Sequence, residues 1–298
     1  MPTVFTNQAC LQHDPGLGHP ETPRRLQAVL ERLGQEPTIQ LVQAPPIADL
    51  VSLLRVHPQS HLDFVRVTSK RGGGAAGPDT VLNGSSWDAV LGAAGAILAG
   101  IHHAHSGRGN AFAAVRPPGH HATAQRAMGF CLVNNVVVAA REAQQLGRDR
   151  VLIVDWDVHH GNGTQALVEQ DAAVRYVSLH QWPWYPGTGR AEERGVGNIF
   201  NLPRPPDLPP EQYVADLWDA FATATSGWTP DILLISAGFD AMAGDPLGGF
   251  TLEPEHFAGL TSRFREHLPD TPIVAMLEGG YAPRRVAEGV AAHVRSLG

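Results

Sequence analysis

The sequence lacks several features that would assign it to a common class of protein. It has only two cysteines in 298 residues, Cys10 and Cys131, which cannot make the disulfide framework of a small secreted protein. No stretch approaches 18 consecutive apolar residues, so we expect no membrane-spanning helix and no membrane partner. The N-terminus has neither a basic segment nor an apolar one after it, so we expect no signal peptide and a cytoplasmic protein.

Positive charge is also scarce. The chain has 22 Lys and Arg against 29 Asp and Glu, a formal net charge of −7. Sequence-independent binding of nucleic acid needs a basic face, so we expect no nucleic-acid partner. With 43% hydrophobic and 17% charged residues, the composition is that of a globular protein with a sizeable core.

Short apolar runs rich in β-branched residues alternate along the chain with longer amphipathic stretches. The predicted strands are Ala111–Val115, Val151–Val154, Val174–Ser178, Ile232–Ser236 and Ile273–Leu277. The predicted helices are Thr22–Leu33, Trp87–His103, Leu132–Gln145, Pro210–Ser226, Pro254–His267 and Pro283–Ser296. This alternation predicts βαβ units and an α/β fold with a mostly parallel sheet. Residues 71–77 and 201–210 are predicted loops, but neither marks a domain boundary, so we expect residues 1–298 to form one domain.

The most informative segment begins with the strand Val151–Val154. Asp155, Asp157, His159 and His160 follow it, ahead of a Gly-Asn-Gly turn. In open α/β sheets, ligands bind at the carboxyl edge of the strands. Asp155, Asp157 and His159 alternate and so share one face of an extended chain, whereas His160 points to the other face and is predicted to be structural. Several buried ionisable groups are costly unless they are paired or bind a metal, so this segment predicts a metal site.

Polar side chains also follow the other predicted strands, at His120 and His121, His180, Asp240, Glu278 and Tyr281. Asp157, His159 and Asp240 together would hold a zinc ion and leave one position open for water. The two adjacent histidines could transfer protons, and the tyrosine could donate a hydrogen bond to an oxyanion. Histidine and carboxylate ligands favour zinc or iron(II) over magnesium without choosing between the first two.

A binuclear manganese site of the arginase type is the competing interpretation of the same segment. Such a site would need a second aspartate close to Asp240. The residue two positions further on is Met242, and Asp245 is the only candidate nearby. We therefore favour a single metal ion.

Six motifs occur in the order found in zinc-dependent histone deacetylases. They are Pro118-Gly-His-His121, Gly129-Phe-Cys131, Asp155-x-Asp157-x-His159-His160-Gly-x-Gly163, Pro186-Gly-Thr-Gly189, Ala237-Gly-x-Asp240 and Gly244-Asp-Pro246, within a match from His19-Pro-Glu-x-Pro-x-Arg25 to Gly279-Gly280-Tyr281. The chain thus resembles a histone deacetylase-like amidohydrolase of the arginase/deacetylase fold group. The resemblance implies a three-layer α/β/α domain with an eight-stranded, mostly parallel sheet, and a zinc ion held by Asp157, His159 and Asp240.

The resemblance also implies roles for other residues. His120 and His121 would form the catalytic dyad, and Tyr281 would be the oxyanion donor. A narrow substrate tunnel would be bordered by Gly129, Phe130 and Tyr185, with Leu247 at its rim. One monovalent cation, K⁺ or Na⁺, would be held by Asp155, Asp157, His159, Ser178 and Leu179. A second would be held by backbone carbonyls around Val168, Asp171, Val174 and Asn198.

Asn162 stands where many class I members of the family have an aspartate, which is a class II-like feature. His120 is expected to pair with Asp155, and a neighbouring carboxylate favours the charged imidazolium. His121, facing the neutral amide of Asn162, should stay neutral more readily. We therefore predict that His121 is the general base that takes a proton from water, and that His120 is mainly its electrostatic partner.

Two substrate classes divide the family, namely acyl-lysine in proteins or peptides and acetylated polyamines. Leu247 occupies the rim position where some polyamine-selective relatives have a glutamate, and a leucine offers no charge to a distal ammonium group. We therefore favour acyl-lysine and keep acetylpolyamine as the alternative, because Glu192 or Glu193 could supply that charge. A binding protein with a degenerate site is a third possibility, which the complete set of ligands, histidine pair and tyrosine argues against. The sequence leaves the oligomeric state open.

Overall fold

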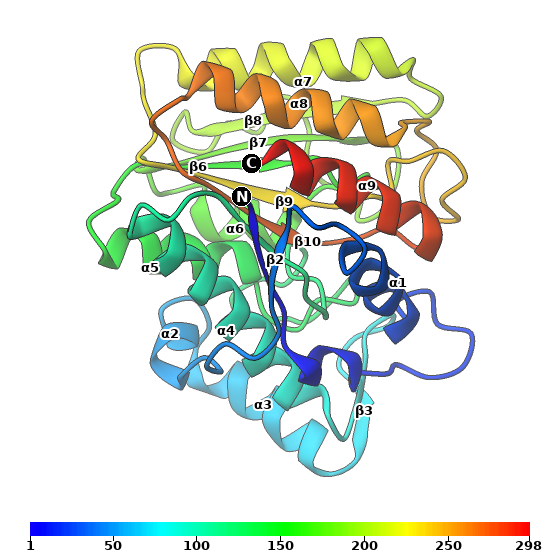
Figure 1. Ribbon diagram of the computed structural model, residues 1–298. Helices are drawn as coiled ribbons and strands as arrows, with labels where there is room; N and C mark the ends of the chain where they lie inside the picture. Colours follow the sequence, from blue (N-terminus) through cyan, green and yellow to red (C-terminus); the bar gives the residue numbers. More distant parts are fainter.

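The alternation of strands and helices folds into one parallel sheet between helices, as the computed structural model of residues 1–298 shows (Figure 1). Eight strands lie in the order β2-β1-β5-β10-β9-β6-β7-β8. Their bounds are β1 Thr3–Phe5, β2 Gln40–Val42, β5 Ala111–Ala113, β6 Val151–Asp155, β7 Val174–Gln181, β8 Ile199–Arg204, β9 Ile232–Ala237 and β10 Ile273–Leu277. Every neighbouring pair is parallel, so the predicted α/β class with an eight-stranded sheet is confirmed.

Helices cover both faces of this sheet and make three layers. Figure 1 shows α7, α8 and α9 on one side and α4, α5 and α6 on the other. The helices are α1 Pro23–Leu33, α2 Leu50–Leu54, α3 Gln59–Lys70, α4 Ser86–His105, α5 Asn135–Gln145, α6 Asn162–Val168, α7 Pro210–Thr225, α8 Pro254–His267 and α9 Pro283–Ser296, with a 3₁₀ turn η1 at Gln8–Leu11. A separate antiparallel pair consists of β3 Gly73–Ala75 and β4 Val81–Asn83.

Local sequence signals explain where several helices begin. Pro23, Pro210, Pro254 and Pro283 are each the first residue of their helix, where proline's missing N–H has no partner to lose. Asn134 caps α5, because its side chain accepts a hydrogen bond from the N–H of Val137. These caps set the starts of the helices that pack on the sheet.

The central strands form the core of the molecule. Every residue of β6, β9 and β10 is buried, as expected for strands covered on both faces. One contiguous cluster of 75 buried hydrophobic residues extends from Val4 to Leu297. The carboxyl ends of these buried strands therefore hold their side chains in fixed positions.

Two predicted loops are wrong in part. Gly73–Ala75, inside residues 71–77, forms β3, and residues 201–204 continue β8 rather than beginning a loop. Pro203 is compatible with a strand because β8 is the last strand of the sheet and pairs only with β7, so no ladder hydrogen bond is needed on its other side. The strands β1, β2 and β8 and the helices α2, α3 and α6 were not predicted.

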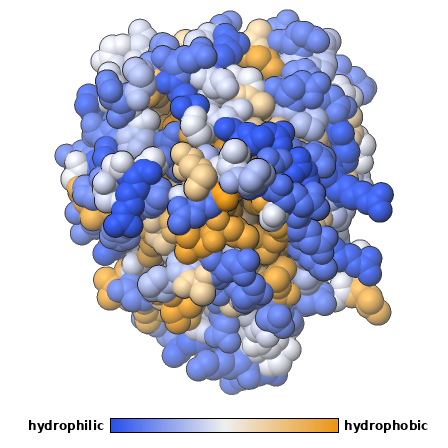
Figure 2. Space-filling model, in the orientation of Figure 1, coloured by the Kyte–Doolittle hydropathy of each residue, from blue (hydrophilic) through white to orange (hydrophobic).

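The surface is mostly hydrophilic on the face drawn in Figure 2, with apolar residues gathered across its middle and lower left. Around α2 and α3 the exposed large apolar side chains are Ile47, Leu50, Val51, Leu54, Phe64 and Val67. No helix is both long enough and apolar enough to cross a membrane.

Candidate active site

The three predicted metal ligands meet at the carboxyl ends of β6 and β9. Asp157 and His159 follow β6, Asp240 follows β9, and all three are buried. Their ligand atoms all lie within 4.8 Å of one another. Nδ1 of His159 lies 3.0 Å from Oδ1 of Asp157 and 3.2 Å from Oδ2 of Asp240. The sheet thus brings together residues that are 83 positions apart at their extremes, as the sequence predicted.

One unused acceptor among these carboxylates fits a metal ion. Oδ2 of Asp240 accepts no hydrogen bond although it is buried, which is costly unless a cation faces it. The other oxygen of Asp240 accepts from the N–H of Val158 at 2.9 Å, and Oδ2 of Asp157 accepts from the N–H of Gly279 at 2.8 Å. The N–H of His159 also donates to Oδ1 of Asp157 at 2.9 Å. Backbone donors thereby fix both carboxylates, and Oδ2 of Asp240 is the one oxygen left without a donor. Two carboxylates and one imidazole form a ligand set that suits zinc.

Two glycines make room for this cluster. A Cβ added at Gly238 would overlap the carboxylate of Asp157, and one at Gly279 would overlap those of Asp157 and Asp240. No side chain larger than hydrogen can therefore stand at either position without moving a ligand. The Ala237-Gly-x-Asp240 and Gly279-Gly280-Tyr281 motifs are explained by this close approach.

The two dyad histidines lie side by side in different electrostatic environments. Their ring centroids are 4.1 Å apart. Nδ1 of His120 lies 3.0 Å from Oδ2 of Asp155, and the hydroxyl of Tyr176 donates to the same oxygen at 2.9 Å. Burial opposes the charged form, yet the carboxylates of Asp157 and Asp155 raise the pKa of His120 well above its usual value. These contacts favour the charged form of His120 over that of its neighbour.

His121 contacts an amide instead of a carboxylate. Its Nδ1 lies 2.8 Å from Oδ1 of Asn162, so Nδ1 carries the hydrogen and Nε2 keeps its lone pair. Burial, together with the positive charges of His120 and His159, lowers the pKa of His121 well below its usual value. The predicted asymmetry between the two histidines agrees with these contacts.

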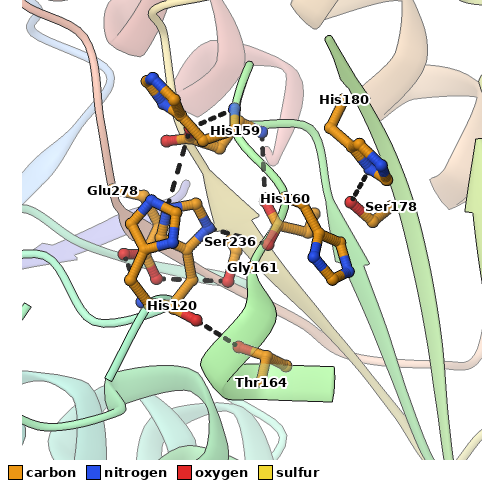
Figure 3. Close-up of polar contacts among 12 residues, drawn as sticks. His120, His159, His160, Gly161, Thr164, Ser178, His180, Ser236 and Glu278 are labelled. Carbon is orange, nitrogen blue, oxygen red and sulfur yellow. Dashed lines mark hydrogen bonds and ion pairs between the residues drawn. The ribbon is translucent and has the colours of Figure 1, made fainter. Parts of the chain in front are cut away.

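A buried glutamate, Glu278, to which the sequence assigned no role, lies beside His120 and supports the loop that carries the dyad (Figure 3). Oε2 of Glu278 accepts hydrogen bonds from the N–H groups of Gly119 at 2.6 Å and His120 at 3.2 Å, and Ser236 donates to Oε1 at 3.2 Å. Burial raises the pKa of Glu278 to about 7. The only signal for this role in the sequence was the position of Glu278 just after β10. Its hydrogen bond with Gly119 joins residues that are 159 positions apart, so no local pattern could reveal it.

Tyr281 lies at the end of a loop that buried charges hold in place. The guanidinium carbon of Arg25 lies 4.8 Å from the centroid of the Tyr281 ring, and Arg25 donates to the carbonyls of Glu278 and Gly280. Asp245 accepts the N–H of Tyr281 at 2.6 Å through Oδ2 and that of Leu247 at 2.9 Å through Oδ1. Both oxygens of Asp245 are thus used by backbone donors, which hold Tyr281 and Leu247 in place.

A cavity of about 190 Å³ leads to His159 and holds every residue predicted for the tunnel. Its lining residues are Asp79, Gly129, Phe130, His159, Trp184, Tyr185 and Leu247. The sequence did not predict Asp79 or Trp184, whose indole N–H donates to the carbonyl of Leu247 at 2.8 Å. A larger cleft of about 590 Å³ lies near Asn110 and Thr271, at the opposite edge of the sheet, and contains none of the site residues.

The remaining predicted residues also lie where the sequence placed them. Asp155 and Ser178 are register partners on β6 and β7, so two of the residues predicted for the first monovalent cation are neighbours. His160 is bonded at both ring nitrogens, to Thr188 at 2.8 Å and to Gln165 at 2.9 Å. These two bonds agree with a structural role for His160.

The molecule has a parallel eight-stranded sheet, and at the carboxyl edge of this sheet lie two carboxylates and a histidine that could hold a metal ion, next to a histidine pair. This combination defines a deacetylase of the arginase/deacetylase fold group. Comparison with known proteins leads to the same class. Residues 19–297 match the histone deacetylase domain family, and the chain belongs to that family.

Relatives come from bacteria, archaea and plants. The chain is 37% identical to the histone deacetylase-like amidohydrolase of Pseudomonas aeruginosa, over 88% of this chain and 72% of that protein. It is 36% identical to a probable deacetylase of Methanothermobacter thermautotrophicus, over 94% of this chain and 86% of that one. Histone deacetylase 15 of Arabidopsis thaliana is 39% identical, over 94% of this chain but only 52% of the plant protein. The crystal structure of the HDA15 HD domain superposes with a TM-score of 0.94 at 36% identity, covering 100% of this chain and 90% of that one. The chain is therefore a hydrolytic deacetylase.

Proposed function

We propose that residues 1–298 act as one catalytic domain that removes acetyl or other short acyl groups from lysine side chains of proteins or peptides. The observation that carries this proposal is the cavity walled by Phe130 and Tyr185 and ending at His159. Two aromatic rings suit a methylene chain and exclude branched groups, because burial between the rings stabilises only a narrow, apolar stem.

Cys10 and Cys131 are both buried free thiols, which supports the predicted cytoplasmic location.

We infer that Asp157, His159 and Asp240 hold one zinc ion. The unpartnered Oδ2 of Asp240 supports this assignment. When bound, zinc would polarise the acyl carbonyl and lower the pKa of water at the site. Asp155, Asp157, His159, Ser178 and Leu179 are proposed to hold K⁺ or Na⁺.

The dyad would move the protons of the reaction. Nε2 of His121 accepts a proton from water as the water oxygen bonds to the acyl carbon. His120 remains an imidazolium beside Asp155 and stabilises the negative charge that develops. The hydroxyl of Tyr281 donates to the carbonyl oxygen when it becomes an oxyanion. As the carbon–nitrogen bond breaks, a protonated dyad histidine delivers a proton to the departing lysine amine.

The charges around the cavity favour acyl-lysine over an acetylated polyamine. Glu193 accepts from the side chain of Gln165 at 2.6 Å, and Glu192 lines a different cleft with Trp182. Neither glutamate lines the cavity beside Leu247. Asp79 is the one carboxylate that lines the cavity, and because it could pair with a distal ammonium group, acetylpolyamine remains the second candidate.

Comparing kcat/KM for an acetyl-lysine peptide and for N-acetylputrescine tests the choice of substrate. We expect the peptide to be preferred, and Leu247→Glu to shift the preference toward the polyamine because it adds the missing charge. A wild-type preference for N-acetylputrescine that disappears in Asp79→Asn would replace acyl-lysine with the alternative. Hydrolysis that is lost with a chelator and restored by zinc would exclude a degenerate binding protein.

A further inference from the structure

A cage of three backbone carbonyl oxygens lies at the far end of α6, and the side chain of Asn198 fills it. Nδ2 of Asn198 donates to the carbonyl oxygens of Val168 at 2.8 Å, Asp171 at 3.0 Å and Val174 at 2.8 Å. Val168 ends α6 and Val174 begins β7, so the turn between them directs its carbonyls inward. Asn198 itself is only 3% exposed. These are the backbone groups to which the family resemblance assigns a second monovalent cation.

Only one orientation of the Asn198 amide fits this cage. Its Oδ1 accepts a hydrogen bond from the N–H of Val196 at 3.2 Å. The reverse orientation would direct Oδ1 at three carbonyl oxygens and Nδ2 at an N–H group, so that like partial charges would face each other on both sides. The donor side of the amide therefore occupies the centre of the cage.

The lone pairs that these carbonyls direct into the cage favour a positively charged centre. Val168 is the last residue of α6, so its carbonyl has no partner within the helix and lies at the negative end of the helix dipole. Outside the helix, the carbonyl of Val168 accepts the N–H of Asp171 at 2.9 Å and the carbonyl of Asp171 accepts that of Val174 at 3.0 Å, and each oxygen keeps a second lone pair for the centre of the cage. A monovalent cation meets this need when carbonyl oxygens replace its hydration shell. An amide nitrogen meets it with two hydrogens. A cation and the Asn198 nitrogen cannot occupy the same centre, so the residues present do not fit a second ion.

We propose that the Asn198 amide replaces the second monovalent cation in this chain and that the carbonyl cage is closed to ions. The turn between α6 and β7 is then held by a covalently attached donor, whatever the salt composition. α6 begins at Asn162, the partner of His121, and ends at the cage, so the Asn198 amide anchors the opposite end of the helix that contacts the dyad, without a bound ion. Removing the amide would convert the cage into a cation site.

Crystals grown with rubidium chloride in place of potassium test this directly, since anomalous scattering locates Rb⁺. We expect no Rb⁺ among the carbonyls of Val168, Asp171 and Val174 in the wild-type chain and a peak there in Asn198→Ala. A Rb⁺ peak in the wild-type cage, with the amide turned away, would overturn the proposal. This result needs only the wild-type protein and so does not depend on the variant's folding.

Melting temperatures in potassium chloride and in choline chloride at equal ionic strength give a second test. Asn201→Ala is the matched control. It removes the buried side-chain amide of Asn201 on β8, whose Nδ2 donates to Gln165 at 2.7 Å, and it leaves Asn198 in the cage. Any stabilisation by potassium at the first predicted cation site should be the same in the wild type and in every variant. We expect Asn198→Ala to gain an additional potassium-dependent rise of about 3–6 °C, the scale for a ligand at tens of times its Kd. The isosteric Asn198→Asp should gain a similar rise. Equal potassium effects in all the chains would contradict the proposal.

Discussion

Replacing Asn162 with aspartate tests which dyad histidine is the base. The new carboxylate would lie where Oδ1 of Asn162 now lies, 2.8 Å from Nδ1 of His121. At a charge separation of about 4 Å and an effective dielectric constant of about 20, the attraction is ~4 kcal/mol. Carboxylate neighbours shift a pKa by roughly 1–3 units in practice. We expect the pKa of His121, which burial and its positive neighbours now hold well below the usual value, to rise by about that amount.

The sign of the effect on rate follows from the base needing to be neutral. A higher pKa keeps His121 protonated up to a higher pH, so the acidic limb of the kcat/KM profile should move up by roughly 1–3 pH units. At the midpoint of the wild-type limb, the variant should be about 5-fold to 500-fold slower, as the fraction of neutral imidazole falls with the same shift. Profiles would be measured on zinc-loaded protein with its metal content determined. Few other contacts change, because Nδ2 of Asn162 has only distant partners at 3.5 Å.

Asn201→Asp is the control for this experiment, since it adds the same charge at the buried amide of Asn201, whose Nδ2 donates to Gln165. It should leave the acidic limb in place. If the limb does not move in Asn162→Asp either, protonation of His121 does not limit the reaction and the reasoning fails. Near-normal turnover in His121→Ala, with loss of turnover in His120→Ala, would reverse the two roles.

Three further substitutions test the parts of the site around the dyad. Tyr281→Phe removes the oxyanion donor and should lower kcat by roughly 10²–10³-fold with little change in KM, and an unchanged kcat would remove Tyr281 from the mechanism. Gly238→Ala should lower the zinc content of the purified protein because its Cβ overlaps Asp157, whereas Gly259→Ala, in open space on α8, should keep the zinc and raise stability by about 0.5–1 kcal/mol; equal zinc contents would contradict the overlap. Glu278→Ala leaves two buried N–H groups without an acceptor and should cost about 1–3 kcal/mol for each in chemical denaturation, while Glu278→Gln should restore most of that stability; similar losses in both variants would mean that the charge matters more than the hydrogen bonds.

The sequence predicted the parts of the fold whose signals are local. The strand β6 and the ligands after it were found because apolar residues end abruptly in carboxylates and imidazoles, and helices were found where proline begins them. The strands β1 and β2 have three residues each, which is too short for a periodic pattern, and they exist because neighbouring strands pair with them. The role of Glu278 was missed because its partners lie far away in the chain.

The turn predicted at residues 161–163 is the most instructive difference. Glycine and asparagine there indicated a break, yet α6 begins at Asn162 and includes Gly163. A Cβ at Gly163 would overlap the backbone of His121 and Ala122, so this glycine permits close packing between α6 and the dyad loop. The composition typical of a turn is here a requirement of tertiary contact, which single-sequence patterns cannot distinguish.

One continuous segment, from Asp155 to the end of α6, determines the electrostatics of the site. It supplies the carboxylate to His120, the amide to His121 and two of the three metal ligands between them. Because seven positions of one chain separate Asp155 from Asn162, the carboxylate and the amide cannot exchange partners without unfolding β6 or α6. The order of the two histidine pKa values is therefore a property of the folded chain before any substrate enters. In the proposed mechanism, a dyad ordered in this way would have its base neutral and its partner charged when the acyl group arrives, so little reorganisation would remain for the transition state.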